Sequence, residues 1–458
     1  MQHRLGLAIL KSTMIACPTA AFAHASEQGF VLLLPTDLYT GAGVAAVALT
    51  VVAQALVPAR WLGRLFRAVP VTRFSLRRLK PVTSTLSGLL LLALIWIGLS
   101  GPRDPLSNPL TLMIWTVFWI GLVAAQGLIG DLWSFVTPWS GPLRLLRRVM
   151  RLSVSLRLPR WLGFWPGVAG FLVFAYLLLA DPSPADPARL ARAVGLYWLF
   201  HLCMGLIFGP RWLYRGEAFT LVFHAYGRLA AFGRSGGRLC LGLPGWQIAR
   251  GRPVPFAFAV LIVALLGTGS FDGLNETFWW LGRLGINPLE FPGRSAVVWQ
   301  NLAGLLIANA ALVTVFATAI ALGLRLARAG PGVALGIRQF APALLPIALG
   351  YHIAHFLPSL LVDGQYALVA LSDPLLRGDD FLGLGDFYVS TGFFNTKATV
   401  RMIFLGQAAA VVIGHVLSVL LTHAIAVRIC ADPRRATFIQ VPLTLFMLGY
   451  TFFGLWLL

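Results

Sequence analysis

Charged residues are scarce in this chain, and their scarcity excludes most soluble folds. Only 11% of the 458 residues are charged, whereas 58% are hydrophobic and the mean hydropathy is +0.79. Soluble globular domains carry roughly 25% charged residues. No polar stretch is long enough to build a soluble domain, so we expect an all-α polytopic membrane protein. The apolar runs are continuous rather than alternating with polar residues, which argues against a β-barrel.

Cysteine and acidic residues are also few, and each shortage excludes a class of protein. Four scattered cysteines provide neither a disulfide framework nor the spacing of a zinc knuckle. Sixteen acidic residues against 36 basic ones leave a net charge of +20. The arginines nevertheless fall in short loops between apolar runs, without the interleaved aromatic and basic pattern of a nucleic-acid module. We therefore expect the lipid bilayer, and no nucleic acid, as a partner.

The N-terminus resembles a secretory signal peptide. Basic residues precede an apolar run, and an A-x-A pattern ends at Ala23. We predict a signal peptide over residues 1–23, followed by a single helical membrane domain over residues 24–458. Cleavage after Ala23 would make His24 the first residue, and its free amine and imidazole together would chelate copper. A second A-x-A pattern ends at Ala25, and cleavage there would remove that ligand.

Apolar runs of roughly 17–25 residues predict about ten transmembrane helices after the signal peptide. They lie near residues 38–57, 84–101, 110–130, 161–180, 193–209, 256–272, 297–323, 340–361, 402–427 and 439–458. Most of the basic residues fall in the loops at one end of these helices, which the positive-inside rule makes cytoplasmic. We therefore expect a bacterial inner-membrane protein whose mature N-terminus is periplasmic. Two long periplasmic loops, 271–295 and 362–401, are rich in acidic residues.

Histidines within apolar segments are the first candidates for a functional site, because ionisable groups are costly in lipid. We predict that His352, His355 and His415, together with His201, reach a similar depth in the outer half of the membrane. Imidazoles beneath acidic loops suit a divalent transition metal such as zinc or copper. Asp272 and Glu276 would then orient the ligands or act as general bases. In the alternative interpretation, each histidine only bonds a neighbouring helix. A haem site is disfavoured, because the histidines do not pair at matched depths on two helices.

Several stretches of the chain are distinctive. They are HASEQGFVLLLPT from His24, FDGLNETFWWLG from Phe271, NPLEFPGRS from Asn287, GYHIAHF from Gly350, SDP from Ser372 and GHVLSVLLTHAIA from Gly414. In these stretches the chain resembles bacterial integral membrane proteins known as fenitrothion hydrolases. The resemblance implies one subunit of a membrane-bound heteromer that cleaves the phosphorus to aryl-oxygen bond of organophosphorus triesters. It implies no catalytic residues.

Three functions follow from these features as hypotheses. The first is the hydrolase subunit, possessing a second membrane subunit as partner and a small apolar ester as substrate. A bound metal would supply hydroxide by lowering the pKa of its water. The second is a transporter or metal-handling protein that uses the same histidines and acids as a cation path from the outer face. The third is a scaffold whose partner carries the chemistry.

Overall fold

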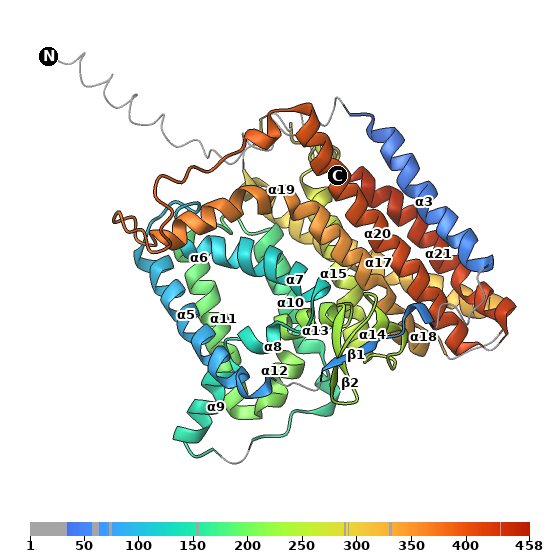
Figure 1. Ribbon diagram of the computed structural model, residues 1–458, viewed down its shortest axis with the longest axis horizontal. Coiled ribbons are helices and arrows are strands. Elements are labelled where there is room, and N and C mark those ends of the chain that lie inside the picture. The colour runs from blue at the N-terminus through green and yellow to red at the C-terminus, as the bar shows by residue number, and fades with distance from the viewer. Residues whose placement is uncertain are drawn as a thin grey trace.

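The structure of the protein, a computed structural model, describes residues 34–56, 64–72, 76–152, 155–287, 290–291, 293–328, 332–430 and 432–458. The predicted signal peptide, its alternative cleavage sites and His24 lie outside these residues. Figure 1 shows the described chain as a bundle of helices with little other regular structure.

Nine helical segments in the described ranges are long and apolar enough to cross a bilayer. They are α3 (Thr36–Leu56), α5 (Lys80–Ser100), the continuous α6–η2–α7 (Pro109–Leu112, Met113–Leu122, Val123–Leu128), α11 (Pro187–Phe208), α15 (Phe256–Asn275), α17 (Val298–Ala327), the continuous α18–η6–α19 (Val333–Phe340, Ala341–Leu344, Leu345–Ser372), α20 (Lys397–Ile429) and α21 (Pro433–Trp456). The chain is therefore a helical membrane protein, as the sequence predicted. The span predicted at 161–180 is the exception. It forms α10 (Trp165–Leu179), whose 15 residues fall short of the roughly 20 that a bilayer requires.

Short elements connect these helices. They are η1 (Leu76–Arg78), α8 (Trp133–Val136), α9 (Ser140–Val149), η3 (Arg160–Leu162), α12 (Pro210–Gly216), α13 (Ala218–Gly227), α14 (Trp246–Ala249), α16 (Phe278–Arg283), η5 (Arg294–Ala296) and η7 (Gly392–Phe394). A small antiparallel sheet of order β1-β3-β2 joins β1 (Val69–Thr72) to the hairpin of β2 (Phe232–Ser235) and β3 (Arg238–Leu241). The all-α prediction missed this sheet. The hairpin turn falls on Gly236 and Gly237, both at positive φ, where glycine is favoured.

Both predicted outer loops are shorter than the sequence suggested, because the helices run further. Helix α19 continues to Ser372 and α20 begins at Lys397, which reduces the loop predicted at 362–401 to residues 373–396. In the loop predicted at 271–295, α15 continues to Asn275 and α16 occupies the middle. In Figure 1 the 373–396 loop runs along the upper edge, whereas the arginine-rich α9, α12 and β2 lie along the lower edge.

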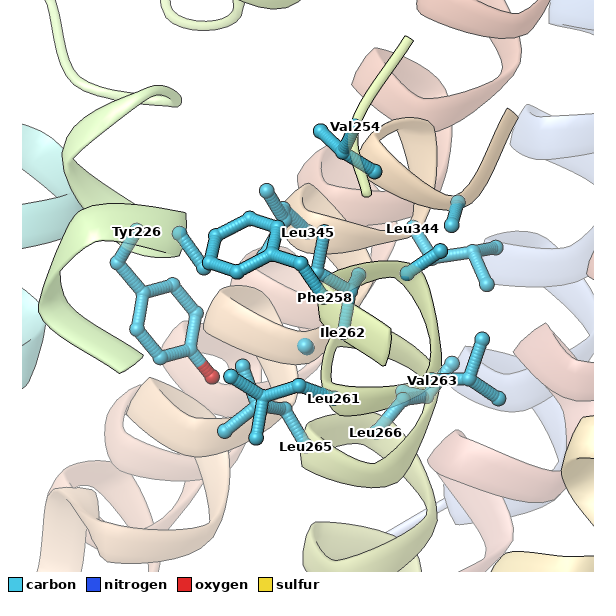
Figure 2. Packing of buried hydrophobic residues seen from close by; sticks show 14 of the residues in the cluster. Tyr226, Val254, Phe258, Leu261, Ile262, Val263, Leu265, Leu266, Leu344 and Leu345 are labelled. Atoms are coloured by element: carbon cyan, nitrogen blue, oxygen red, sulfur yellow. The ribbon is translucent and has the colours of Figure 1, made fainter. Parts of the chain in front are cut away.

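Helix α15 forms the centre of the bundle. Most of its side chains are buried, as expected of a helix that is apolar on every face. Figure 2 shows its residues Phe258, Leu261 and Ile262 packed between Tyr226 of α13 and the Leu344–Leu345 pair where α19 begins. Helices α3 and α5 instead lie at the periphery, and few of their side chains are buried. The core thus holds α15 and α19 in fixed register.

Helix α19 also packs closely on α20, because glycines face the contact. A Cβ at Gly350 would overlap the backbone carbonyl of Ala410, and a Cβ at Gly414 would lie 2.5 Å from the carbonyl oxygen of Pro346. Small residues let helix backbones approach in this way in membrane proteins. The opposite side of α19 contacts η2. Helix α19 is therefore enclosed by α15, α20 and η2, and the site described next lies on it.

Candidate functional site

A carboxylate and an imidazole meet between α15 and α19. Asp272 lies in the last turn of α15, and its Oδ2 atom is 3.4 Å from Nε2 of His355 on α19. The Asp272 side chain is 9% exposed and that of His355 is 18% exposed. A buried charge is expensive unless it is paired, and each of these side chains provides the other with a partner. The structure thus brings two of the predicted site residues, Asp272 and His355, into contact.

The pair borders a small cavity inside the bundle. Its lining includes Trp119 of η2, Tyr351 and His352 of α19, and the apolar Phe171, Leu178, Leu265 and Phe356. The space open to water inside it is ≈ 20 Å³. A cavity needs about 10–15 Å³ of such space to hold one water molecule. The cavity therefore has room for water beside the Asp272–His355 pair.

Three buried polar atoms belong to residues that line this cavity and lack a hydrogen-bond partner among the described residues. They are Nε1 of Trp119, the hydroxyl of Tyr351 and Nε2 of His352. Buried polar groups in folded proteins nearly always have a partner, and leaving one without costs about 1–3 kcal/mol. All three residues line one cavity, which favours a polar occupant there. Water is the smallest molecule that satisfies both donors and acceptors.

The helix sequences explain how these side chains meet. His352 and His355 are three residues apart, so they share a face of α19. The Tyr351 ring stacks on His355 at a centroid distance of 5.7 Å, and it lies against the Gly269–Gly273 face of α15. A Cβ at Gly273 would overlap the Tyr351 hydroxyl. Glycines spaced by four thus let α19 approach α15 closely enough for the Asp272–His355 contact.

A proline removes one backbone hydrogen bond of α19 next to His355. Pro358 lies inside the helix and has no N–H to donate to the carbonyl four residues earlier. That carbonyl belongs to Ala354, and it accepts a hydrogen bond of 2.9 Å from Nε2 of Gln407 on α20. The amide of Gln407 thereby replaces the lost backbone bond and ties α20 to the turn that carries His355.

The helical segment that carries Trp119, which also lines the cavity, is irregular. Segment η2 is a π-helix in the middle of a predicted span, and π-helical turns are frequent at functional sites. The segment contributes Trp119, whose indole meets the His352 ring edge-on at a centroid distance of 5.2 Å. The wider helical turn thus places a donor opposite His352.

The remaining predicted site residues are not brought into this cavity. Glu276 is 59% exposed at the end of α15 and lies 3.8 Å from Arg294. Nδ1 of His415 lies 2.9 Å from the Val411 carbonyl on its own helix. His201 lies in an aromatic cluster on α11, where its Nδ1 accepts a hydrogen bond of 3.0 Å from Trp212. Similar depth in the membrane did not imply lateral contact.

The donor set does not fit a zinc or copper site. Among the residues that the structure describes, no three His, Cys, Asp or Glu side chains lie close enough to share a metal ion. Zinc sites in proteins use three or four such ligands. Asp272 and His355 provide two, and His24 lies outside the described residues.

The aspartates of the 373–396 loop fold the loop itself. Asp373 accepts the backbone N–H groups of Arg377 and Gly378, and Asp380 accepts the Ser372 hydroxyl and the N–H groups of Leu384 and Gly385. These hydrogen bonds lower the pKa of both carboxyls, chiefly through the Arg377 N–H for Asp373 and the Ser372 hydroxyl for Asp380. Both carboxylates thus accept hydrogen bonds from nearby residues of the same segment.

Sequence reasoning missed Trp119, Tyr351 and Gln407 as parts of the site. Two signals were present in the sequence. Glycines at positions 269 and 273 form a small-xxx-small pair in an apolar helix, and Pro358 within the histidine-bearing helix predicts a carbonyl that needs a donor from a neighbouring helix. Nothing in the spacing identified Trp119.

Comparison with protein-family models, with curated proteins and with solved structures finds no match for this chain.

Proposed function

We propose that the Asp272–His355 pair is a proton-handling site, and that the chain is a membrane transporter that moves protons or couples to them. The observation that carries this proposal is the buried carboxylate–imidazole pair beside a cavity of ≈ 20 Å³, three of whose lining residues hold a polar atom without a partner in the described chain. Ionisable groups inside membrane helices are typical of proton relays. The cavity accommodates water, and water carries protons to and from such a pair.

The residues around the pair suggest a route. Glu276 lies one helical turn beyond Asp272 on α15, about 6 Å along the axis, and is exposed at the end predicted to be periplasmic. A proton would pass from Glu276 at the surface to the Asp272–His355 pair. From there the cavity water would pass it to Nε2 of His352. Each transfer joins an acceptor to a donor that the site already contains.

Sealed proteoliposomes with an internal pH-sensitive dye test this proposal. Because Asp272→Asn and His355→Asn each remove one titratable group, we expect either change to slow proton movement roughly 100-fold or more, as removal of an acid–base group does in enzymes. His423→Asn is the matched control, because His423 is a buried histidine that pairs with Gln440 away from the cavity. Unchanged flux in Asp272→Asn, or an equal loss in His423→Asn, would overturn the proposal.

The organophosphorus hydrolase remains a second candidate, supported by the same dyad. A carboxylate-oriented imidazole next to a water site is the arrangement of a general base, and the apolar lining of Phe171, Leu178 and Phe356 would suit an aryl group. The enclosed space fits water and not an aryl triester, so this function requires the helices to part. Release of nitrophenol from an aryl phosphotriester, lost in His355→Asn and independent of any gradient, would establish it over transport.

Two further hypotheses about the chain are tested in the same preparation. If a co-encoded membrane subunit were needed for either activity, the protein expressed alone would be inactive and the reconstituted pair active. Metal analysis of the purified protein tests zinc and copper. Because no three potential metal ligands lie close enough together in the described chain to hold an ion, we expect any stoichiometric copper to be lost in His24→Ala and kept in His355→Asn.

A further inference from the structure

A second pocket shares no lining residue with the cavity, and its charged residues are all arginines. Arg157, Arg160, Arg211 and Arg215 line it together with Leu158. The space open to water in this arginine pocket is ≈ 670 Å³. Arg157, Arg160 and Arg211 are exposed and Arg215 is half-buried. Four arginine residues thus line one open volume at the end of the molecule that carries α9 and α12.

Two segments distant in sequence build this pocket, and a glycine joins them. The backbone N–H of Leu156 donates a hydrogen bond of 2.9 Å to the Ile207 carbonyl at the end of α11. Gly209, at φ +75°, then turns the chain into α12, and a Cβ there would lie 2.7 Å from Oγ of Ser155. The strand-like segment that carries Arg157 is therefore held against the turn that orients Arg211 and Arg215.

The positive charge of the arginine pocket is not neutralised by the described residues. No ion pair in the described ranges involves any of the four arginines, although Arg215 lies over the Phe164 ring at 5.9 Å. Arg211 and Arg215 are four residues apart on one helix, where like charges repel. The adjacent acid, Glu217, is fully buried and accepts hydrogen bonds from the Phe219 N–H and from the Tyr197 hydroxyl. An anion from outside the chain would relieve this repulsion.

Exposed apolar side chains beside the arginine pocket indicate that the anion belongs to a lipid. Trp161, which directly follows Arg160, is 78% exposed, and Leu156, which directly precedes Arg157, is 64% exposed. Exposed tryptophan next to arginine is typical of the level of lipid headgroups. Guanidinium groups bind phosphate oxygens in pairs, and basic pockets at the ends of membrane helices bind anionic headgroups.

We propose that the arginine pocket binds the phosphate of an anionic phospholipid headgroup. The acyl chains would lie along the exposed side chains of Leu156 and Trp161, and the phosphate would accept hydrogen bonds from Arg211 and Arg215. This site is independent of the proton-handling proposal, since the two pockets share no lining residue.

Lipid binding by the purified full-length protein tests the proposal. Retained lipid per protein is measured by native mass spectrometry after titration with phosphatidylglycerol, phosphatidylcholine or inorganic phosphate. We expect phosphatidylglycerol to bind and phosphatidylcholine not to bind. Each arginine near an anionic headgroup contributes about 1 kcal/mol, so Arg211→Gln with Arg215→Gln should weaken phosphatidylglycerol binding roughly 25-fold.

The matched control removes the same charge elsewhere. Arg144 and Arg148 are exposed on α9 and lie outside the pocket lining, so Arg144→Gln with Arg148→Gln should leave binding unchanged. If the α12 variant fails to fold, Arg157→Gln with Arg160→Gln tests the pocket from the other segment. Equal weakening in the control, binding unaffected by either pocket variant, or saturation by inorganic phosphate without competition from phosphatidylglycerol would overturn the proposal.

Discussion

At the scale of residues, the site depends on polar atoms that the fold leaves without partners. The sequence singled out Asp272, His352 and His355 because costly ionisable groups in apolar helices indicate function, and the structure places all three at one cavity. The sequence also singled out His415 and His201, and the structure gives those histidines other neighbours. Position along a helix is encoded in the sequence, whereas the direction in which a side chain points depends on packing by other helices.

The contact between Tyr351 and α15 provides a prediction at this scale. Gly273→Ala introduces a Cβ that overlaps the Tyr351 hydroxyl, so we expect the free energy of unfolding to fall by roughly 1–3 kcal/mol and the Asp272–His355 contact to open. Gly282→Ala on α16 is the control. Its Cβ would meet nothing within 4 Å, and alanine is a better helix former by about 0.5–1 kcal/mol. Titration with a denaturing detergent measures both variants. A Gly273→Ala protein as stable as the control would contradict this contact.

At the scale of elements, α19 and α20 are coupled through the carbonyl that Pro358 leaves free. Gln407→Leu leaves the Ala354 carbonyl without its donor and should cost about 1–3 kcal/mol. Pro358→Ala restores a backbone N–H to that carbonyl, so Gln407→Leu should cost less in the Pro358→Ala background. A double-mutant cycle should give a coupling of about 1 kcal/mol. If the two changes are additive, the amide of Gln407 does not replace the lost backbone bond.

The stability of the loop between α19 and α20 should depend on pH. Hydrogen bonds hold the pKa of Asp373 and Asp380 below the ordinary value, so their contribution to loop stability is complete above the unfolded pKa of about 3.9. It is lost as the pH falls through the lower folded pKa values. Hydrogen exchange of the Gly378 and Leu384 amides should therefore show protection that disappears only at acidic pH.

Substitutions in this loop distinguish the role of Asp373 and Asp380 from that of the neighbouring Asp379. Asp380→Ala should abolish protection of the Leu384 amide at neutral pH, since that amide donates to Asp380. Asp379→Ala should leave the protection intact, because the bonds that fold the loop go to Asp373 and Asp380. Protection that persists at the lowest pH at which the helices remain folded would be inconsistent with carboxylates as the cause.

At the scale of the whole molecule, long apolar runs predicted the helices well, because burying backbone groups in lipid leaves helices as the main option. The exceptions have local causes. α10 is only 15 residues long, and the glycine-rich hairpin pairs with β1, which is distant in sequence. The cavity could not be predicted, because it depends on glycine and proline contacts between three helices.

The orientation of the bundle remains a prediction that labelling can test. In a cysteine-free background, Ser235→Cys in the hairpin should react with an impermeant thiol reagent only after the membrane is opened. Asp379→Cys in the 373–396 loop should react in intact cells, because the positive-inside rule makes that end periplasmic. Both residues are exposed, so access depends on the side of the membrane. The reverse pattern would invert the predicted topology.

The central claim is that Asp272 and His355 exchange protons with water, and infrared spectroscopy tests it most directly. The difference between the wild-type and Asp272→Asn spectra isolates the Asp272 carboxyl band. Our account predicts that this band responds to pH, that His355→Asn changes the response, and that His423→Asn does not. A band fixed in one form throughout, or a transition that ignores His355, would contradict it.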